Sequence, residues 1–422
     1  MTEQGETIED IFRRDRGRIL ATLIRTVGDF DLAEDGLATA WESAVRQWPI
    51  EGRPENPRAW LIRAARNRAI DEIRRESTAR RKQEELHSTI APDDSTAPAP
   101  DDSDELSVGD DLLRLIFTCC HPSLAVEAQV ALTLRALGGL STEEIARAFL
   151  VSPVVMAQRL VRCKQKIRSA RIPYRVPDEA DLPERLSAVM SVIYLVFNEG
   201  YSATSGETLL RETLASEAIR LGRLLCELMP AQPGPRGLLA LMLLHDARRA
   251  ARVTPGGDLV VLDEQDRARW DQAQIREGLS LLDQALGANS PDAYAVQAAI
   301  AALHARAARA ADTDWPQIAG LYARLFVLNP SPIVMLNHAV AVSFADGPIE
   351  GLRLLDQLSV SGVLGGYHLL PAARGDLLRR LGRREESAAA YREALAMVGS
   401  DVEKRFLQRR LADVEGLAPL DP

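Results

Sequence analysis

Residues 141–168, STEEIARAFLVSPVVMAQRLVRCKQKIR, constrain the fold most, because they carry the start signals of two successive helices. Ser141 and Glu144 have the S-x-x-E spacing of a capping box, which predicts a helix that begins there. The helical pattern breaks at residues 151–153, where Ser152 can cap a second helix. Pro153 can occupy the first turn of that helix, since a missing N–H has no cost at this position. The sequence therefore predicts two helices joined by a tight turn.

The second helix is predicted to have one apolar and one cationic side. Its inward residues recur at helical spacing: Met156, Leu160, Cys163 and Ile167. The outward stripe consists of Gln158, Arg159, Arg162 and Lys166. No Asp or Glu occurs between residues 145 and 177, whereas a surface helix without a partner usually mixes charges. We therefore expect a helix-turn-helix whose second helix enters the major groove of DNA.

The chain as a whole is expected to be all-α and to contain several domains. Its 422 residues exceed the size of one typical core, and Ala, Leu, Arg and Glu, which favour helices, dominate the composition. No segment approaches the ~20 successive apolar residues of a membrane span, and the amino terminus, MTEQGETIED, is acidic. We expect a cytoplasmic protein without membrane contact.

Charge divides the chain into segments, although the net charge is only -9. Residues 87–111 carry eight acidic side chains and no Lys or Arg, whereas residues 112–177 carry ten Lys or Arg and three acids. The first of these segments is rich in Pro, Ser and Asp, which predicts a flexible linker. The expected domains are residues 1–86, the linker 87–111, the helix-turn-helix domain 112–177, a helical extension 178–290, and paired helices 291–422.

A second cationic patch lies in NPRAWLIRAARNRAIDEIRR. Arg63, Asn67 and Arg74 share one side of the predicted helix, and Ile62, Ala65, Ala69 and Ile73 are expected to pack on the other. Trp60 follows the Pro-rich approach EGRPENPRAW. An aromatic ring beside Asn and Arg suits unpaired bases, which stack and form edge hydrogen bonds. A core position is the alternative interpretation for Trp60.

The carboxy-terminal part contains motifs with structural and chemical interpretations. LLRRLGRREESAAAYREAL resembles a tetratricopeptide unit in which Leu381-Gly382 closes one helix while Ala389, Tyr391 and Ala394 pack the next; an irregular helical bundle is the alternative. PGGDLVVLDEQD is expected to form a loop with a brief strand.

Neither a catalytic site, a cofactor nor a metal is expected. Glu199, His245 and Asp246 could be assembled into a site, but the chain has no Gly-rich phosphate loop, zinc pattern or nucleophile elbow to accompany them. Cys119-Cys120-His121 is interpreted as buried helix-end thiols rather than as a metal corner.

DLAEDGLATAW, NPRAWLIRAARNRAIDEIRR and, after the linker, LSTEEIARAFLVSPVVMAQRLVRCKQKIR together resemble the two domains of extracytoplasmic function (ECF) sigma factors of the sigma-70 family. The resemblance covers about residues 8–172. It implies a subunit that binds core RNA polymerase and directs it to promoter DNA. RLSAVMSVIYLVFNEGYSATSG, LLALMLLHDARRAAR and the tetratricopeptide-like tail are similar to a subgroup with a long helical extension, which implies that the extension regulates activity or binds a regulatory protein or peptide.

The same resemblance implies roles for individual residues. The polymerase contacts would be Asp31, Glu34 and Asp35. The contacts with the minus-ten element would be Asn56, Arg58, Trp60, Arg63, Asn67, Arg74 and Arg75. The contacts with the minus-thirty-five element would be Ser152, Ala157, Gln158, Arg159, Val161, Arg162, Lys164 and Lys166. The alternative function is a helix-turn-helix regulator with a helical sensor domain that is not a polymerase subunit.

Overall fold

The computed structural model describes residues 8–416 except 85–104, 150, 203–207, 255, 257, 288–290 and 400. Within these residues the regular secondary structure is helical, apart from one isolated antiparallel bridge between Val253 and Leu259. The all-α expectation is confirmed, and the brief strand expected near residue 259 is reduced to that bridge. The chain divides into two units, Met1–Val196 and Phe197–Pro422.

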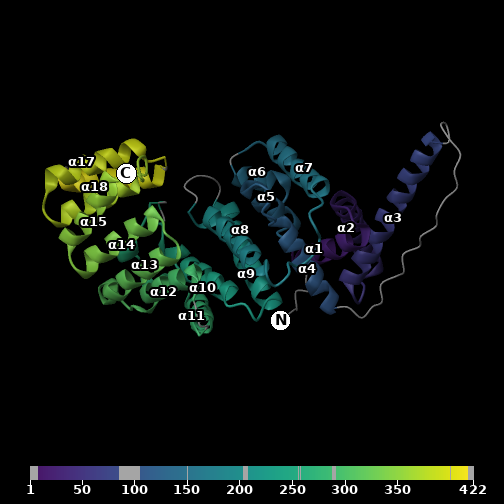
Figure 1. The fold of residues 1–422 in the computed structure, drawn as a ribbon, viewed down its shortest axis with the longest axis horizontal. Helices are drawn as coiled ribbons and strands as arrows, with labels where there is room; N and C mark the ends of the chain where they lie inside the picture. The colour runs from purple at the N-terminus through teal and green to yellow at the C-terminus, as the bar shows by residue number, and fades with distance from the viewer. Residues whose placement is uncertain are drawn as a thin grey trace. The chain divides into compact units, whose positions relative to one another are not determined.

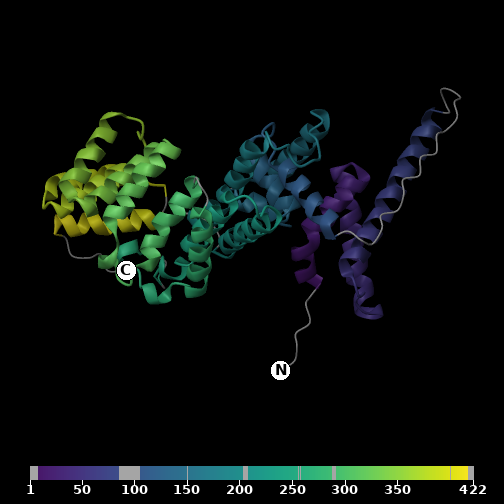
Figure 2. The same ribbon diagram turned by 60° about the horizontal axis from the view of Figure 1, so that its bottom comes forward.

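The first unit contains two groups of helices (Figure 1). They are α1 (Ile8–Val27), α2 (Phe30–Glu51) and α3 (Pro57–Glu84), followed by α4 (Glu105–Cys119), α5 (Val126–Ala136), α6 (Thr142–Ala148), α7 (Pro153–Ser169) and the first part of α8 (Leu182–Ser202). Helices α1, α2 and α3 pack on one another, and α1 also packs on α4. The second half of α3 projects away from the helices beside it (Figure 2). Gly36 permits the close approach of α2 to α3, because a Cβ at this position would lie 2.7 Å from the carbonyl oxygen of Ala65.

Helix α4 begins inside the segment that was expected to be a linker. The linker prediction for residues 87–104 lies outside the described residues, but residues 105–111 are helical. Asp111, which composition assigned to a solvated tether, is fully buried. The composition does not predict this helix, because the helix gains its stability from packing against α1.

The second unit continues with helices that pack mainly on their neighbours in sequence (Figures 1 and 2). They are α9 (Thr208–Leu228), α10 (Gly234–Asp246), α11 (Gln272–Leu286), α12 (Ala293–Arg306), α13 (Trp315–Leu328), α14 (Pro332–Ala345), α15 (Pro348–Val360), α16 (Leu369–Arg380), α17 (Arg384–Met397) and α18 (Asp401–Glu415). Among the described residues, 3-10 turns lie between α10 and α11, at Arg249–Ala251, Leu262–Glu264 and Arg267–Arg269, and between α12 and α13, at Ala310–Asp312.

The turn between α16 and α17 is formed as expected. Gly382 adopts a φ of 74° after α16, and Tyr391 is buried with its ring against Gly375. The expected packing of Ala389 is wrong: Ala389 is exposed, and the alanines on either side of it are buried. A shift of one residue in a helix turns a side chain by about 100°, which moves it off the packed face. The tetratricopeptide classification of these pairs stays a prediction.

Candidate nucleic-acid interface

The helix-turn-helix of α6 and α7 is built from local signals. Ser141 Oγ accepts from the Glu144 N–H, and the Glu144 carboxylate accepts from the Ser141 N–H, which completes the capping box. Ser152 caps α7 with a single bond, in which its Oγ accepts from the Val155 N–H, and Pro153 lies in the first turn. The four predicted inward residues are all buried: Met156, Leu160, Cys163 and Ile167. We refer to α7 as the recognition helix.

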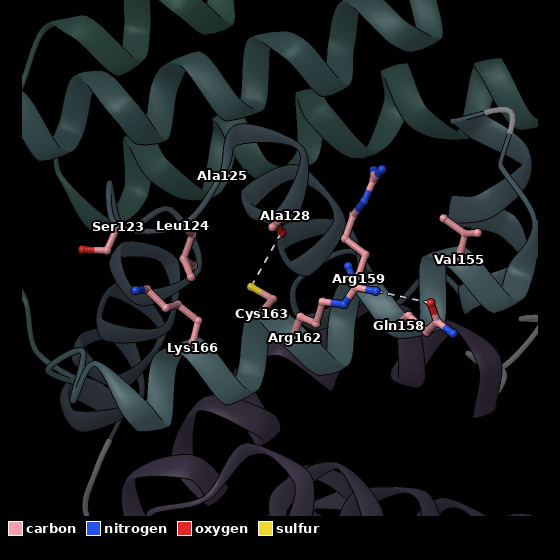
Figure 3. A pocket seen from close by; sticks show the side chains of 10 residues that line it. All are labelled: Ser123, Leu124, Ala125, Ala128, Val155, Gln158, Arg159, Arg162, Cys163 and Lys166. Carbon is pink, nitrogen blue, oxygen red and sulfur yellow. Dashed lines mark hydrogen bonds between the residues drawn. The ribbon is translucent and has the colours of Figure 1, made fainter.

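The outward side of the recognition helix borders a groove of about 410 Å³, which the start of α5 closes on the other side (Figure 3). Gln158 and Arg162 lie along it with a 3.5 Å hydrogen bond between their side chains, and Arg159 and Lys166 line it too. The arginine and lysine side chains along the groove have the chemistry to contact a phosphate backbone.

Most residues predicted for the minus-thirty-five element are accessible. Ala157, Gln158, Val161, Arg162 and Lys166 are exposed, and Arg159 is half-buried. Exposed valine methyl groups fit the methyl of thymine, and Gln and Arg can form paired hydrogen bonds with base edges. Ser152 is also exposed, although its hydroxyl already accepts from the backbone of Val155.

Lys164 differs, because its side chain turns toward α2 instead of toward the groove. Its Nζ donates to Asp31 Oδ1 at 2.8 Å and to Glu34 Oε2, and the side chain is only 13% exposed. One turn further on, Arg168 pairs with Asp29 at 3.1 Å and with Asp31 at 3.3 Å. In this arrangement the ammonium group of Lys164 donates to carboxylates, so a contact between Lys164 and a DNA phosphate stays a prediction.

Glu34 is the centre of the ion-pair network between α2 and the helix-turn-helix domain. Besides Lys164, it contacts Arg16 Nη2 at 3.3 Å and Arg135 Nε at 3.5 Å. Burial acts to lower the pKa of Lys164, but Glu34 and Asp31 outweigh it and raise the pKa, so the ammonium stays charged. Burial, and then the charge of Arg135, lower the pKa of Arg16 to about 10 against the opposing effect of Glu34.

The sequence contained only a faint sign of this network. Asp29 is identifiable as the N-cap of α2, and its side chain does accept from the N–H groups of Asp31 and Leu32. Its pairing with Arg168, 139 positions away, has no local signature. Asp35, the third predicted polymerase contact, is exposed and lies in a hollow of about 460 Å³ between α2 and α3.

The cationic side of α3 is accessible as predicted. Its exposed residues are Arg63, Asn67, Arg74 and Arg75. Asn56, also exposed, uses its side-chain oxygen to accept from the Ala59 N–H at 3.0 Å at the start of α3, and Arg58 is half-buried. The expected packing of Ile73 is wrong: the side chain is 40% exposed, because it lies beyond the stretch of α3 where Leu61, Ala65 and Ala69 are buried.

Trp60 lies at the edge of an aromatic row and is not sealed inside the fold. Its ring meets that of Trp48 edge-on, with 5.5 Å between centroids, and Trp48 in turn contacts Trp41. Trp48 and Trp41 are buried, whereas Trp60 is half-buried. The row fixes the orientation of Trp60 while one part of the ring stays accessible for stacking on a base.

His245 lies in a cluster of packed aromatic and arginine side chains in the second unit. Tyr201 stacks on Phe197, meets His245 edge-on and accepts a 3.0 Å hydrogen bond from Arg248, and Arg252 donates to the Tyr201 carbonyl at the end of α8. Burial, followed by neighbouring positive charges, lowers the pKa of His245 well below its ordinary value. Asp246 pairs with Arg249. These contacts agree with the interpretation of His245 and Asp246 as packing elements.

The two adjacent thiols at the end of α4 are buried, as interpreted. Cys119 and Cys120 are inside the fold, and burial raises the pKa of Cys120 to about 12. Burial also raises the pKa of Cys163, to about 11. Among the described residues no group of His, Cys, Asp and Glu side chains is placed to hold a metal ion. No helix in the described ranges is long and apolar enough to cross a bilayer.

Three family models match successive parts of the chain. Residues 11–79 match sigma-70 region 2, residues 114–167 match sigma-70 region 4, and residues 185–286 match a family of unknown function, DUF6596. The first match contains α2 and most of α3, and the second ends within the recognition helix. The two basic helices therefore fall in the two sigma domains.

The chain also resembles curated proteins. It is 44% identical over 397 residues to an uncharacterized protein of Rhizobium meliloti, which covers 94% of this chain and 93% of the relative. It is 25% identical over 169 residues to the probable ECF RNA polymerase sigma factor SigI of Mycobacterium tuberculosis, which covers 40% of this chain and 57% of that protein. The chain therefore contains the region 2 and region 4 domains of the sigma-70 family, followed by a long helical carboxy-terminal part, and it is a distant homologue of an ECF sigma factor.

Proposed function

We propose that the protein binds core RNA polymerase and directs promoter-specific initiation, without catalytic chemistry of its own. The observation that supports the proposal is the presence, within one unit, of two different accessible basic surfaces. One is the exposed Arg and Asn side of α3 beside the half-buried Trp60, and the other is the groove along the recognition helix. A protein that reads duplex DNA alone needs the second surface but not the first.

The proposed division of labour follows from the chemistry of each surface. Trp60 and Asn67 are assigned to the non-template strand of the minus-ten element, where unpaired bases offer both a face and an edge. Gln158 and Arg162 are assigned to base edges of the minus-thirty-five element. Asp31, Glu34 and Asp35 are assigned to polymerase. The extension is proposed to regulate this activity, through a protein or peptide that binds its helix pairs.

The test separates this function from that of a helix-turn-helix regulator. Trp60→Ala and Asn67→Ala are compared with wild type for core binding, duplex binding and promoter melting detected by permanganate. A sigma factor loses melting in both variants and keeps core and duplex binding. A regulator shows no core-dependent melting in any of the three chains.

The role of the extension is tested separately. Run-off transcription by the full chain is compared with that by a chain ending at Val196, the last residue of the first unit. A regulatory extension changes the yield per bound polymerase in one direction or the other, whereas equal yields from the two chains would contradict it.

A further inference from the structure

Two of the three acidic residues assigned to polymerase, Asp31 and Glu34, are already paired with the recognition helix. Asp29, Asp31 and Glu34 lie at the start of α2 and form what we call the α2 acidic surface. Lys164 bonds to two of its carboxylates and Arg168 pairs with two. A cationic partner that needs Asp31 and Glu34 must therefore displace the recognition helix first.

Attachments on both flanks hold the helix-turn-helix domain in this position. Asp111, from α4, bonds to Arg25 of α1 at 2.8 Å. After α7, the Tyr174 hydroxyl lies 2.8 Å from the carbonyl oxygen of Ala21 in α1 and 3.1 Å from that of Asp111. The contact of α7 with the α2 acidic surface thus belongs to an extended interface rather than to one isolated pair.

The two sides of the recognition helix differ in this arrangement. Lys164 is enclosed, and its hydrogen bonds to carboxylates are of the strong, charge-assisted kind. Gln158, Val161 and Arg162 remain exposed on the other side. The arrangement pairs Asp31 and Glu34 with the recognition helix and leaves the side chains assigned to base edges accessible.

We propose that unit 1 forms a closed state in which the recognition helix acts as an internal competitor of polymerase for the α2 acidic surface. The inference rests on the proposed function. Polymerase binds the fraction of molecules that is open, so its apparent affinity falls in proportion to that fraction. Promoter phosphates that attract Lys164 and Arg168 release the carboxylates. Binding of DNA and binding of polymerase therefore reinforce each other by the same factor.

The experiment measures opening and polymerase affinity independently in the full chain. Dyes are attached at Ile50→Cys on α2 and Val126→Cys on α5, both at exposed positions, in a chain whose partly accessible Cys226 is replaced by serine. Energy transfer between the dyes reports opening without polymerase. Binding of bacterial core polymerase is titrated without DNA in undyed chains.

Lys164→Ala is expected to lower energy transfer and to raise core affinity about tenfold, the gain when a state populated at about one tenth becomes dominant. Arg168→Ala is expected to change both readings in the same direction. Because Arg168 is exposed, its replacement should not disturb folding, and it therefore tests the proposal even if Lys164→Ala misfolds. Arg175→Ala is the matched control, because Arg175 forms only an exposed pair with Asp178. It is expected to leave both readings at wild-type values.

Two results would overturn the closed state: unchanged energy transfer in Lys164→Ala and Arg168→Ala, or opening without a gain in core affinity. Either leaves the proposed sigma function standing, provided that wild type binds core. Failure of wild type and of every variant to bind core would instead remove the proposed function, and with it the competition.

Discussion

Replacement of Asp111 by asparagine tests the interface that joins α1 to α4. The Asp111 carboxylate is fully buried and accepts from Arg25 Nε at 2.8 Å and from Arg114 Nη1 at 3.0 Å. Asparagine has nearly the same shape but no charge, and only its oxygen can accept. The substitution therefore removes one hydrogen bond and weakens the other, whose arginine donor stays charged but loses the charge of its acceptor.

The expected cost is about 2 kcal/mol. A hydrogen bond to a charged group contributes about 1.5–3 kcal/mol, and one such bond is lost. The two arginine side chains are 36% and 33% exposed, so water recovers part of the loss. For a unit of this size, 2 kcal/mol corresponds to a decrease in Tm of about 4–8 °C.

The neighbouring residue provides the control, because Asp110 is exposed. Asp110→Asn should change the free energy of unfolding by less than about 0.5 kcal/mol. Urea unfolding is followed by tryptophan fluorescence in a chain with Trp270→Phe and Trp315→Phe, in which the remaining tryptophans, Trp41, Trp48 and Trp60, all lie in the first unit. Equal effects of Asp110→Asn and Asp111→Asn would refute the assigned burial and pairing.

Three further predictions concern other parts of the molecule. Gly36→Ala should destabilise the first unit by about 1–3 kcal/mol in the same urea assay, because its methyl group would press on the α3 backbone; a stabilised variant would contradict this contact. Burial and neighbouring arginines lower the pKa of His304 from 6.5 to about 4, so the unfolded chain binds more protons than the folded chain as the pH falls through this window. The free energy of unfolding should then decrease by up to about 1.4 kcal/mol per pH unit, and His304→Gln should lessen that slope; the same slope in both chains argues against the buried neutral imidazole. Lys166→Ala should weaken duplex binding alike on all sequences and reduce the salt dependence by about one ion, whereas Gln158→Ala should relax discrimination at one base pair; the reverse pattern in binding assays would exchange their roles.

Elements with local signals could be predicted from the sequence. The caps at Ser141 and Ser152 and the buried stripe from Met156 to Ile167 are confirmed, because a cap and a helical repeat are set by residues within a few positions of one another. The same holds for Gly382, whose left-handed backbone ends a helix turn.

Contacts between distant segments could not be predicted. Lys164 and Asp31 are 133 positions apart, and either residue alone is an ordinary exposed charge until the fold brings the two together. Asp111 ends an acidic, Pro-rich stretch whose average composition favours a linker, and only its contacts with α1 and α4 show that it is buried. The exposure of Ile73 and Ala389 could not be predicted, because a helical repeat does not reveal where the neighbouring helix ends or begins.

The most direct test of the proposed function adds the purified full chain to core RNA polymerase and a genomic DNA library, and maps the 5′ ends of the transcripts. We predict that transcripts begin at a limited set of promoters, and that they depend on the chain and on Trp60 and Asn67. Transcription that is the same with and without the chain would contradict the assignment as an initiation subunit.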